Sequence, residues 1–475
     1  ELARSMQVVA ALLFLMVCWW ITEAVPLPAT ALLPALVLPL FRVTGVHGGE
    51  VVTFTNRNTL ANYAHPVIYL FLGGFLLAAA MQKWRLDRRF TLWMLTRGSL
   101  ADNPRHILLG MMAVTAFLSM WISNTATTAM MLPLGLGVLS SMNLKAGESH
   151  FGTCLMLGIA WAASIGGVAT IIGSPPNGIA LGILNAHFGG DPAYRHITFL
   201  DWLSFGVPYV VLYVPVAWWI LLRTRPPEID RVPGARERFL AQRRELGPLS
   251  SGEKGTIAVF LLAVVLWVTN PFWTAILPQR MTAALSWVDE YSIGLTCGVL
   301  MFFVPVRGSK HRFLLDWKDT SFVDWGTLIL FGGGIALSEA MFQTGLASWI
   351  ANAFVGVLGT PPTLVMMFAV IVFMGLLTEV TSNTAVTTMI VPVIISIALR
   401  TGQNPVALSL AAAVAASMAF MLPVATPPNA LVFATGYVSV KDMVRSGILL
   451  EILSWFMTTA IMAVFARWLF GVVSF

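Results

Sequence analysis

A short polar triplet occurs twice in this sequence, each time inside an apolar stretch. Ser123-Asn124-Thr125 lies within FLSMWISNTATTAMMLP, and Ser382-Asn383-Thr384 lies within GLLTEVTSNTAVTTMIVP. Hydroxyl and amide groups are costly in lipid unless they find hydrogen-bonding partners. A single copy is explained equally well by hydroxyl groups that bond back to their own helix. Two copies half a chain apart instead predict two related elements that meet at one polar site.

The chemistry of these residues suits an anion that is accompanied by cations. Helices that begin just after each triplet would point their N-termini, with partial positive charge and free N–H groups, at the site. Unwound carbonyls and hydroxyls suit Na⁺. No Lys or Arg lies at the predicted depth of the triplets. The residues therefore predict an anionic substrate held by neutral groups together with Na⁺, although a neutral amino acid or sugar stays an alternative.

The elements that position these residues are membrane helices. The 475 residues are 57% hydrophobic and only 11% charged, whereas a soluble domain carries about 25% charged residues. Many charge-free stretches are long enough to cross a bilayer, and the alternating pattern of a barrel is absent. No basic patch for nucleic acid is present. The three cysteines are scattered, with neither metal-ligand spacing nor a disulfide framework.

Loop charges predict the topology. Basic residues concentrate in 83–105, 223–254 and 307–318, which the positive-inside rule assigns to the cytoplasm. Counting back three spans places Glu1 outside, which is unusual for a chain without a cleavable signal. We therefore expect an additional N-terminal span upstream of the given sequence. Continuous spans are predicted at 6–22, 27–43, 66–82, 199–222, 256–270, 291–306 and 326–345.

The first triplet lies near the middle of residues 106–143. With about 14 apolar residues on either side, each helical arm would rise about 21 Å, short of the ~30 Å hydrocarbon core. A re-entrant hairpin is therefore predicted, in preference to one long span or two ordinary spans with a buried turn. Glycine and proline interrupt the next segment, 151–187, which predicts a broken helix with free carbonyls at membrane depth.

The second half of the chain repeats the first in the same order. LFLGGFLLAAAMQ (70–82) matches LFGGGIALSEAMF (330–342), IIGSPPNGIAL (171–181) matches PVATPPNALVF (423–433), and ITFLDWLSFGV (197–207) matches VSVKDMVRSGI (438–448). These matches predict an internal duplication. We divide the chain into a first repeat (1–222), a cytoplasmic linker (223–254) and a second repeat (255–475), which contains a second hairpin at 361–400 and a second broken helix at 404–436.

The two hairpins are predicted to enter the membrane from opposite sides. The first follows a cytoplasmic basic segment directly, whereas one span (326–345) separates the second from the basic residues at 307–318. This pattern is typical of an inverted-repeat secondary transporter with a substrate site near the midplane. The predicted fold is an all-α polytopic membrane protein with two re-entrant helical hairpins and two broken helices.

The motifs SNTATTAMMLP, GSPPN, SNTAVTTMIVP and PVATPPNA resemble the signatures of the divalent anion/sodium symporter family, from about residue 6 onward. The resemblance implies a bacterial Na⁺/dicarboxylate transporter, multi-pass in the plasma (inner) membrane. It also implies a homodimer in which a transport domain holding the hairpins moves as an elevator against a scaffold domain. Family members normally begin with one more helix than this sequence contains.

The resemblance also implies binding residues, with at least two Na⁺ ions in each protomer. One Na⁺ site would use Ser119, Ser123, Asn124 and the carbonyl of Gly173. The other would use Thr378, Thr381 (through its backbone carbonyl), Asn383 and the carbonyl of Ala425. Substrate carboxylates would meet Asn124, Thr125, Ser174, Asn383, Thr384, Thr426 and Pro427, with Ser382 as a weaker candidate. Ser174 and Thr426 could instead be local caps beside the prolines.

Several ionisable residues lie in or near apolar sequence, where a carboxylate is a functional hypothesis by default. Glu379 could tune the second Na⁺ site or carry a proton, and the alternative is a structural carboxylate that bonds to backbone. Glu23, Glu339 and Asp201 are predicted to be structural.

The predicted function is Na⁺-driven uptake of C4-dicarboxylates such as succinate, fumarate or malate. Three alternatives stay open: a Na⁺-independent dicarboxylate exchanger, a citrate or sulfate carrier of the same fold, and an anion channel or membrane enzyme. An enzyme is disfavoured because no Ser/His/Asp set or metal-ligand cluster lies at midplane depth.

Overall fold

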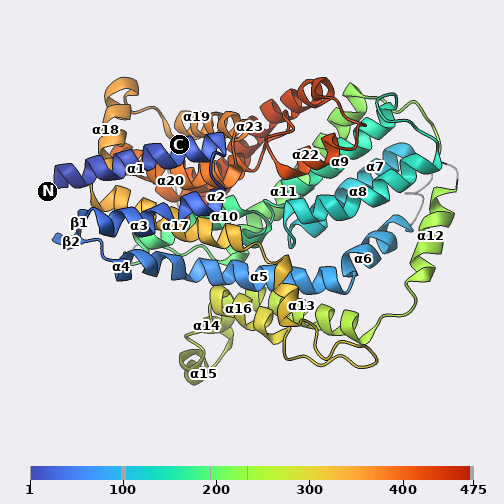
Figure 1. The fold of residues 1–475 in the computed structure, drawn as a ribbon, viewed down its shortest axis with the longest axis horizontal. Coiled ribbons are helices and arrows are strands. Elements are labelled where there is room, and N and C mark those ends of the chain that lie inside the picture. Colours follow the sequence, from blue (N-terminus) through green and yellow to red (C-terminus); the bar gives the residue numbers. More distant parts are fainter. Residues whose placement is uncertain (1, 98–102, 193, 233, 471–475) are drawn as a thin grey trace.

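The computed structural model describes residues 2–97, 103–192, 194–232 and 234–470, which form an almost entirely helical protein (Figure 1). The polytopic helical membrane fold is confirmed, since seven helical stretches among these residues are long and apolar enough to cross a membrane. They are Leu2–Thr22, Asn56–Lys83, Phe199–Thr224, Ser251–Ile276, Trp325–Gln343, Asn383–Thr401 and Val440–Phe465.

The prediction of one continuous span over 27–43 is wrong. The helix α1 (Leu2–Thr22) is followed by two short helices, α2 (Leu27–Ala31) and α3 (Leu33–Leu40). The break at Leu32 arises because Pro34 lacks the N–H that would continue the first of them. An antiparallel pair of strands then follows, β1 (Thr44–His47) and β2 (Glu50–Thr53), which the sequence analysis missed. Gly48 and Gly49 make their turn with positive φ.

The first hairpin and the first broken helix are present as predicted. After α4 (Asn56–Ala61) and the short η1 (Asn62–Ala64), the chain forms α5 (Pro66–Lys83) and α6 (Leu86–Leu95). The hairpin consists of α7 (Pro104–Ser119) and α8 (Asn124–Ser141), and residues 98–102 of the predicted cytoplasmic segment lie outside the described residues. The broken helix consists of α9 (His150–Gly166), η2 (Ile171–Gly173) and α10 (Pro175–Phe188).

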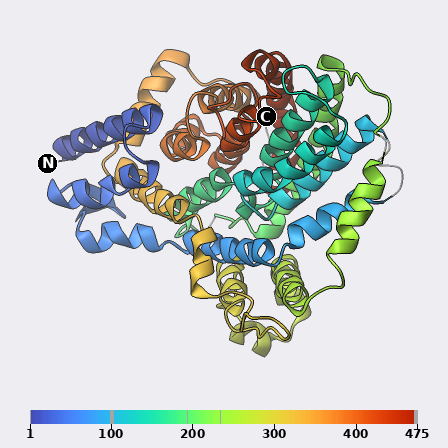
Figure 2. The same cartoon turned by 45° about the vertical axis from the view of Figure 1, so that its right-hand side comes forward.

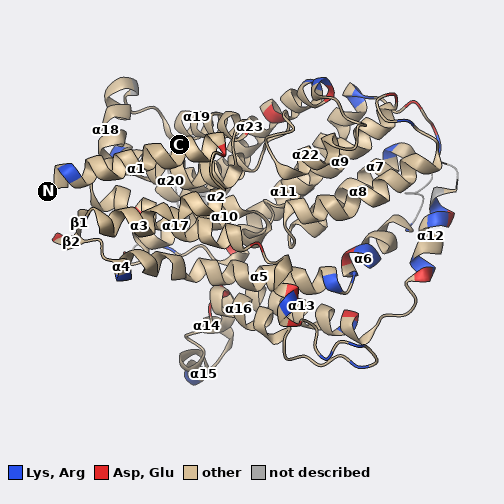
Figure 3. Ribbon diagram, in the orientation of Figure 1, with Lys and Arg blue, Asp and Glu red and all other residues tan. Residues whose placement is uncertain are grey.

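The predicted linker is not a simple loop. Between α11 (Phe199–Thr224) and α13 (Ser251–Thr269) it contains a helix, α12 (Ala235–Glu245). Figure 3 shows Lys and Arg gathered on α6 and α12 at one end of the molecule, whereas most of α8 and α17 carries no charge. This clustering agrees with the assignment of both basic segments to one side of the membrane.

The second hairpin and broken helix are also present. Short elements follow α13: η3 (Asn270–Phe272), α14 (Trp273–Ile276), α15 (Gln279–Ala284), α16 (Glu290–Leu300) and η4 (Trp317–Phe322). Next come α17 (Trp325–Gln343), α18 (Leu346–Leu358) and the hairpin α19 (Thr363–Thr378) and α20 (Asn383–Thr401). The broken helix is α21 (Pro405–Ala416) and α22 (Pro427–Phe433), and α23 (Val440–Phe470) ends the described chain.

The two hairpins lie on different sides of the molecule. Figures 1 and 2 both place α7 and α8 toward one end and α19 and α20 toward the other. Elsewhere, α5 and α16 pack closely at glycines. Gly73 of α5 lies so near Gly294 of α16 that a Cβ added at Gly73 would overlap the Gly294 backbone.

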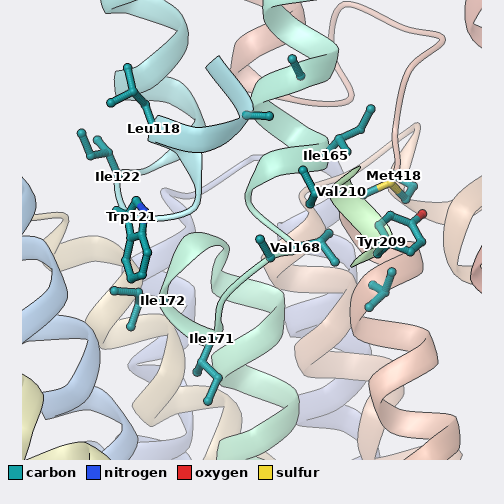
Figure 4. Close-up of a cluster of buried hydrophobic side chains, with 14 of the residues drawn as sticks. Leu118, Trp121, Ile122, Ile165, Val168, Ile171, Ile172, Tyr209, Val210 and Met418 are labelled. Carbon is teal, nitrogen blue, oxygen red and sulfur yellow. The ribbon is translucent and has the colours of Figure 1, made fainter. Parts of the chain in front are cut away.

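A large apolar core supports the turn of the first hairpin. Figure 4 shows Trp121 and Ile122 of that turn near Ile172 of the broken helix, with Val168 and Tyr209 further along the same core. The Trp121 ring also makes an edge contact with Phe260 of α13, at 5.0 Å between ring centroids. Since a buried Trp contributes a large contact area, this packing fixes the turn that carries the first polar triplet.

Candidate binding site

A cavity of about 840 Å³ lies where the two hairpin turns meet the two broken helices. A cavity of this volume is typical of a small-molecule site. All the residues that the sequence analysis assigned to the substrate line it: Asn124, Thr125, Ser174, Ser382, Asn383, Thr384, Thr426 and Pro427. Residues more than two hundred positions apart are therefore brought into one site.

Four helices begin at the wall of this cavity. The first residues of α8 and α20 are Asn124 and Asn383, and those of α10 and α22 are Pro175 and Pro427. The N-termini of α8 and α20 have N–H groups without a partner inside the helix and a partial positive charge. Those of α10 and α22 begin with two prolines, which have no N–H, so they contribute only the partial positive charge of the helix end. Of the described residues that line the cavity, none is Lys, Arg or His. The positive potential in the cavity walls therefore comes from backbone.

Two residues that line the cavity also cap these helices. Ser123 accepts a hydrogen bond from the Ala126 N–H at 3.3 Å, and Thr426 accepts one from the Asn429 N–H at 3.3 Å. Ser174 makes no such cap and lies 3.2 Å from the hydroxyl of Ser417, a residue of the other broken helix. The capping alternative thus holds for Thr426 but not for Ser174, whose hydroxyl links the two halves.

Three oxygen atoms converge behind the first hairpin turn. The Ser119 hydroxyl oxygen lies 2.7 Å from Asn124 Oδ1 and 2.7 Å from the Ala163 carbonyl oxygen. A hydroxyl has one proton, so it can donate to only one of these acceptors at a time. The buried cluster therefore has more acceptor oxygens than protons, which suits a cation.

Two glycines bring backbone close to this cluster. A Cβ added at Gly173 would lie 2.6 Å from the Gly167 carbonyl oxygen and 3.0 Å from that of Met120. A Cβ added at Gly167 would run into the side-chain amide of Asn124. Only glycine lets the unwound segment of the first broken helix approach the hairpin turn this closely.

The second hairpin turn has the same arrangement. Thr378 Oγ1 lies within hydrogen-bonding distance of Asn383 Oδ1 and 2.8 Å from the Ala416 carbonyl oxygen. Thr378 and Ser119 are both fully buried. Hydroxyl, amide and carbonyl oxygens at both turns fit Na⁺, which is held by such groups where membrane helices unwind. The hydroxyl of Thr381 bonds instead to the Trp20 carbonyl of α1 at 3.2 Å, which leaves only its backbone for the site.

Two asparagines that sequence reasoning did not assign hold the unwound segments in place. The Nδ2 group of Asn177 donates to the carbonyls of Gly167 (2.9 Å) and Thr170 (2.8 Å). That of Asn429 donates to the carbonyls of Ala419 (3.2 Å) and Leu422 (3.0 Å). Both side chains are fully buried. The signal was available, because the Pro-Pro-Asn motif occurs in both halves of the sequence.

Glu379 acts as a structural clamp. Its carboxylate accepts hydrogen bonds from three consecutive backbone N–H groups, those of Phe420 (2.6 Å), Met421 (2.9 Å) and Leu422 (3.0 Å). These residues belong to the unwound segment between α21 and α22, so the clamp fixes that segment to the second hairpin turn. Of the two hypotheses for Glu379, these contacts favour the backbone-bonding one.

Three other carboxylates were predicted to be structural, and the contacts of two of them agree with local roles. Glu339 accepts from the Asn62 side chain at 2.5 Å and from the Gln343 side chain at 2.8 Å. Asp201 completes a capping box with Thr198 at the start of α11. Glu23 instead lines the cavity, together with Asp324, the N-cap of α17.

Comparisons with known proteins agree with this architecture. The family model described as "Sodium:sulfate symporter transmembrane region" matches residues 1–472. The chain is 38% identical to the sodium-dependent dicarboxylate transporter SdcS of Staphylococcus saprophyticus, over 92% of this chain and 81% of the relative. It is 35% identical to the SdcS protein of Staphylococcus aureus over the same shares.

Two solved structures share the fold at low sequence identity. The YdaH transporter of Alcanivorax borkumensis matches with a TM-score of 0.58 and 15% identity, over 97% of this chain and 99% of that one. The MtrF protein of Neisseria gonorrhoeae, described with a class of antimetabolite efflux pumps, matches with a TM-score of 0.55 and 14% identity, over 97% and 95%.

The fold, the family model and the SdcS relatives together define a multi-pass membrane transporter, not an enzyme. The chain belongs to the sodium:sulfate symporter family, as the match over residues 1–472 shows. This confirms the family resemblance that its motifs indicated. In bacteria a protein of this kind lies in the plasma membrane.

Proposed function

We propose that this protein couples the inward movement of Na⁺ to the uptake of C4-dicarboxylates such as succinate, fumarate or malate. The observation that carries the proposal is the convergence of four helix N-termini and two oxygen-rich clusters on one cavity without a basic side chain. The name of the SdcS relatives supports both the ion and the substrate class.

Charge balance explains why both ligands are needed. A dicarboxylate brings two negative charges into a site whose own positive charge is limited to helix ends. Two Na⁺ ions, one at the Ser119 and Asn124 cluster and one at the Thr378 and Asn383 cluster, would offset them. In their absence the carbonyls and amide oxygens that face the cavity would repel the carboxylates. We therefore infer at least two Na⁺ ions per protomer.

The transport cycle follows from the same energetics. Na⁺ binds first and orders the two hairpin turns, the dicarboxylate then binds, and the neutralised transport domain crosses the membrane as an elevator. An exposed polar site without its ligands makes crossing costly. We propose that the protein works as a homodimer, with the contact made by the scaffold domains.

The movement can be followed at one contact. The Nδ2 group of Asn185 on α10 donates to the Tyr291 hydroxyl on α16 at 2.6 Å. The distance between spin labels placed on these two helices should show two populations, and the addition of Na⁺ and succinate should shift the balance between them. A single unchanged distance under all conditions would contradict the elevator.

Uptake into proteoliposomes tests the function. Labelled succinate is supplied with and without an inward Na⁺ gradient, to empty vesicles and to vesicles preloaded with unlabelled succinate. Accumulation that needs the gradient and no preload supports a symporter. Uptake that needs the preloaded succinate and does not depend on Na⁺ would make the protein an exchanger. Citrate and sulfate are tested as substrates in the same assay. Flux far above carrier rates without accumulation would indicate a channel.

Single substitutions tie this activity to the site. Asn124→Ala and Asn383→Ala should each abolish Na⁺-driven uptake in folded protein, because each removes both a cation ligand and a contact to substrate. Asn352→Ala, at an exposed position of α18, is the matched control. The proposed site would be abandoned if both site variants transported like the unchanged protein.

A further inference from the structure

A second buried carboxyl group lies in the membrane away from the cavity. Glu451 is on α23 and is fully buried. Its Oε1 atom accepts a hydrogen bond from the Trp455 indole N–H at 3.1 Å, whereas Oε2 has no hydrogen-bond partner among the described residues. None of the ion pairs within the described chain involves Glu451.

A glycine on the second hairpin makes room for this group. A Cβ added at Gly375 of α19 would lie 2.6 Å from Glu451 Oε1 and 2.8 Å from Trp455 Nε1. Gly375 comes one helical turn before Glu379, the residue that clamps the unwound segment. The carboxyl group of Glu451 therefore packs directly against the arm that ends at the second oxygen cluster.

Among the described residues, the groups around Glu451 offer no positive charge. The neighbouring titratable groups are the Glu379 carboxylate at the C-cap of α19 and the phenols of Tyr209 and Tyr213 on α11. The third packed element, α21 (Pro405–Ala416), contains no charged residue. Glu379 has three backbone N–H groups to stabilise its negative charge, but Glu451 has a single indole N–H.

We propose that Glu451 is a proton-binding site, and that the protonated form is the one that holds α19 against α23 during transport. An unpaired charge inside a membrane protein is energetically costly, and a bound proton removes that cost. A metal ion is disfavoured, because the described residues contain no group of acidic, His or Cys ligands suited to one.

Loss of the proton should weaken the second hairpin. A bare carboxylate at Glu451 would face the carboxylate of Glu379 across the contact that Gly375 provides. Repulsion or entry of water would then loosen α19, which ends at the cation ligand Thr378. Alkaline pH should therefore lower the affinity for Na⁺ and slow transport, an effect that rests on the proposed function.

Infrared spectroscopy tests the proton directly and does not depend on transport. In purified protein at about pH 8, where exposed carboxyl groups are ionised, we expect a carboxylic-acid C=O band. Glu451→Gln should remove this band, and Glu339→Gln should not, because both oxygens of Glu339 already accept amide hydrogen bonds. If Glu451→Gln does not fold, Gly375→Ala should shift the band by crowding Oε1. A spectrum of the unchanged protein without the band would overturn the proposal. So would a band that stays unchanged in Glu451→Gln or, if that variant does not fold, in Gly375→Ala.

The pH dependence of uptake tests the consequence. Between about pH 7 and pH 9 succinate is fully ionised, so its own titration does not contribute. We expect uptake at fixed Na⁺ to fall with rising pH in the unchanged protein and in Glu339→Gln, and to stay level in Glu451→Gln. An identical alkaline fall in Glu451→Gln contradicts the inference. If no variant transports succinate at all, the proposed function has failed, while the infrared result still decides on the proton.

Discussion

The hydroxyl oxygen of Ser119 lies 2.7 Å from Asn124 Oδ1, across the turn that joins the arms of the first hairpin. Thr378 and Asn383 have the same relationship in the second hairpin, and each hydroxyl also reaches a carbonyl of its neighbouring broken helix. The duplicated sequence thus builds one oxygen-rich cluster twice. Neither cluster contains a charged side chain, so a cation there keeps its full charge to offset a bound anion.

Removal of one hydroxyl should weaken cation binding. Ser119→Ala and Thr378→Val each delete one proposed cation ligand, and such a bond is worth about 1.5–3 kcal/mol when a charged group is involved. We expect the Na⁺ concentration for half-maximal uptake to rise by about tenfold or more. Thr115→Val is the matched control, because Thr115 lies one turn earlier on α7 and its hydroxyl only bonds to the Met111 carbonyl of its own helix. A control as impaired as the site variants would contradict the ligand assignment.

The close approach at Gly167 should be sensitive to one methyl group. Gly167→Ala places a Cβ against the Asn124 amide, so the cluster must open. We expect Na⁺-dependent uptake to be lost while the protein still reaches the membrane. Gly137→Ala on α8 is the control, since a Cβ there meets nothing within 4 Å. Normal uptake by Gly167→Ala would show that the site does not depend on this geometry.

The asparagines of the Pro-Pro-Asn motifs should matter for folding as well as transport. Asn177→Ala removes two buried hydrogen bonds. The Thr170 carbonyl keeps the bond from the Gly173 N–H, but the Gly167 carbonyl loses its side-chain partner, at a cost of about 1–3 kcal/mol. The thermal unfolding midpoint of purified protein should fall by several degrees, and added Na⁺ should stabilise the variant less than the unchanged protein. Asn429→Ala should behave alike. If Na⁺ raised the unfolding midpoint of both variants as much as that of the unchanged protein, these asparagines would not contribute to the cation sites.

A charge network outside the membrane predicts a defined pH dependence. Lys83 donates hydrogen bonds to Asp316 at 3.1 Å and to Asp319 at 2.6 Å. The bond from Lys83 holds the pKa of Asp316 below its ordinary value of 3.8. Because the folded-state pKa is lowered, this stabilisation is present above about pH 4 and is lost as the pH falls through the lowered value.

Asp316→Asn should therefore lower the unfolding midpoint at neutral pH, by an amount that corresponds to about 1 kcal/mol or less, because Asp316 is partly exposed. The two proteins should converge in acid. Asp230→Asn, at an exposed position of the linker, should show no such difference. A constant gap between Asp316→Asn and the unchanged protein down to the acid range would refute the assignment.

Much of the fold could be predicted because it depends on local patterns. The two triplets and the Pro-Pro-Asn motifs mark helix starts and breaks, and the structure places α8, α10, α20 and α22 at those positions. Asn124, Ser174, Asn383 and Thr426 meet in one cavity, as a pair of broken repeats requires. The residues whose position follows from a repeated motif were thus predictable.

Features that depend on distant contacts were not predictable. The three N–H groups that Glu379 binds lie more than forty residues away, so no spacing rule indicates them. The same is true of Ser174 and Ser417, which meet across the two halves. The continuous span over 27–43 was wrong because apolar composition does not reveal that Pro34 ends one helix and starts the next.

Equilibrium binding of labelled succinate to purified protein, titrated with Na⁺ at constant ionic strength, tests the central claim most directly. If Na⁺ ions at the two clusters complete the anion site, binding should be absent in choline and should rise with Na⁺ along a sigmoidal curve. Asn124→Ala and Asn383→Ala should each flatten that curve. Succinate binding of equal affinity in choline and in Na⁺ would contradict the account.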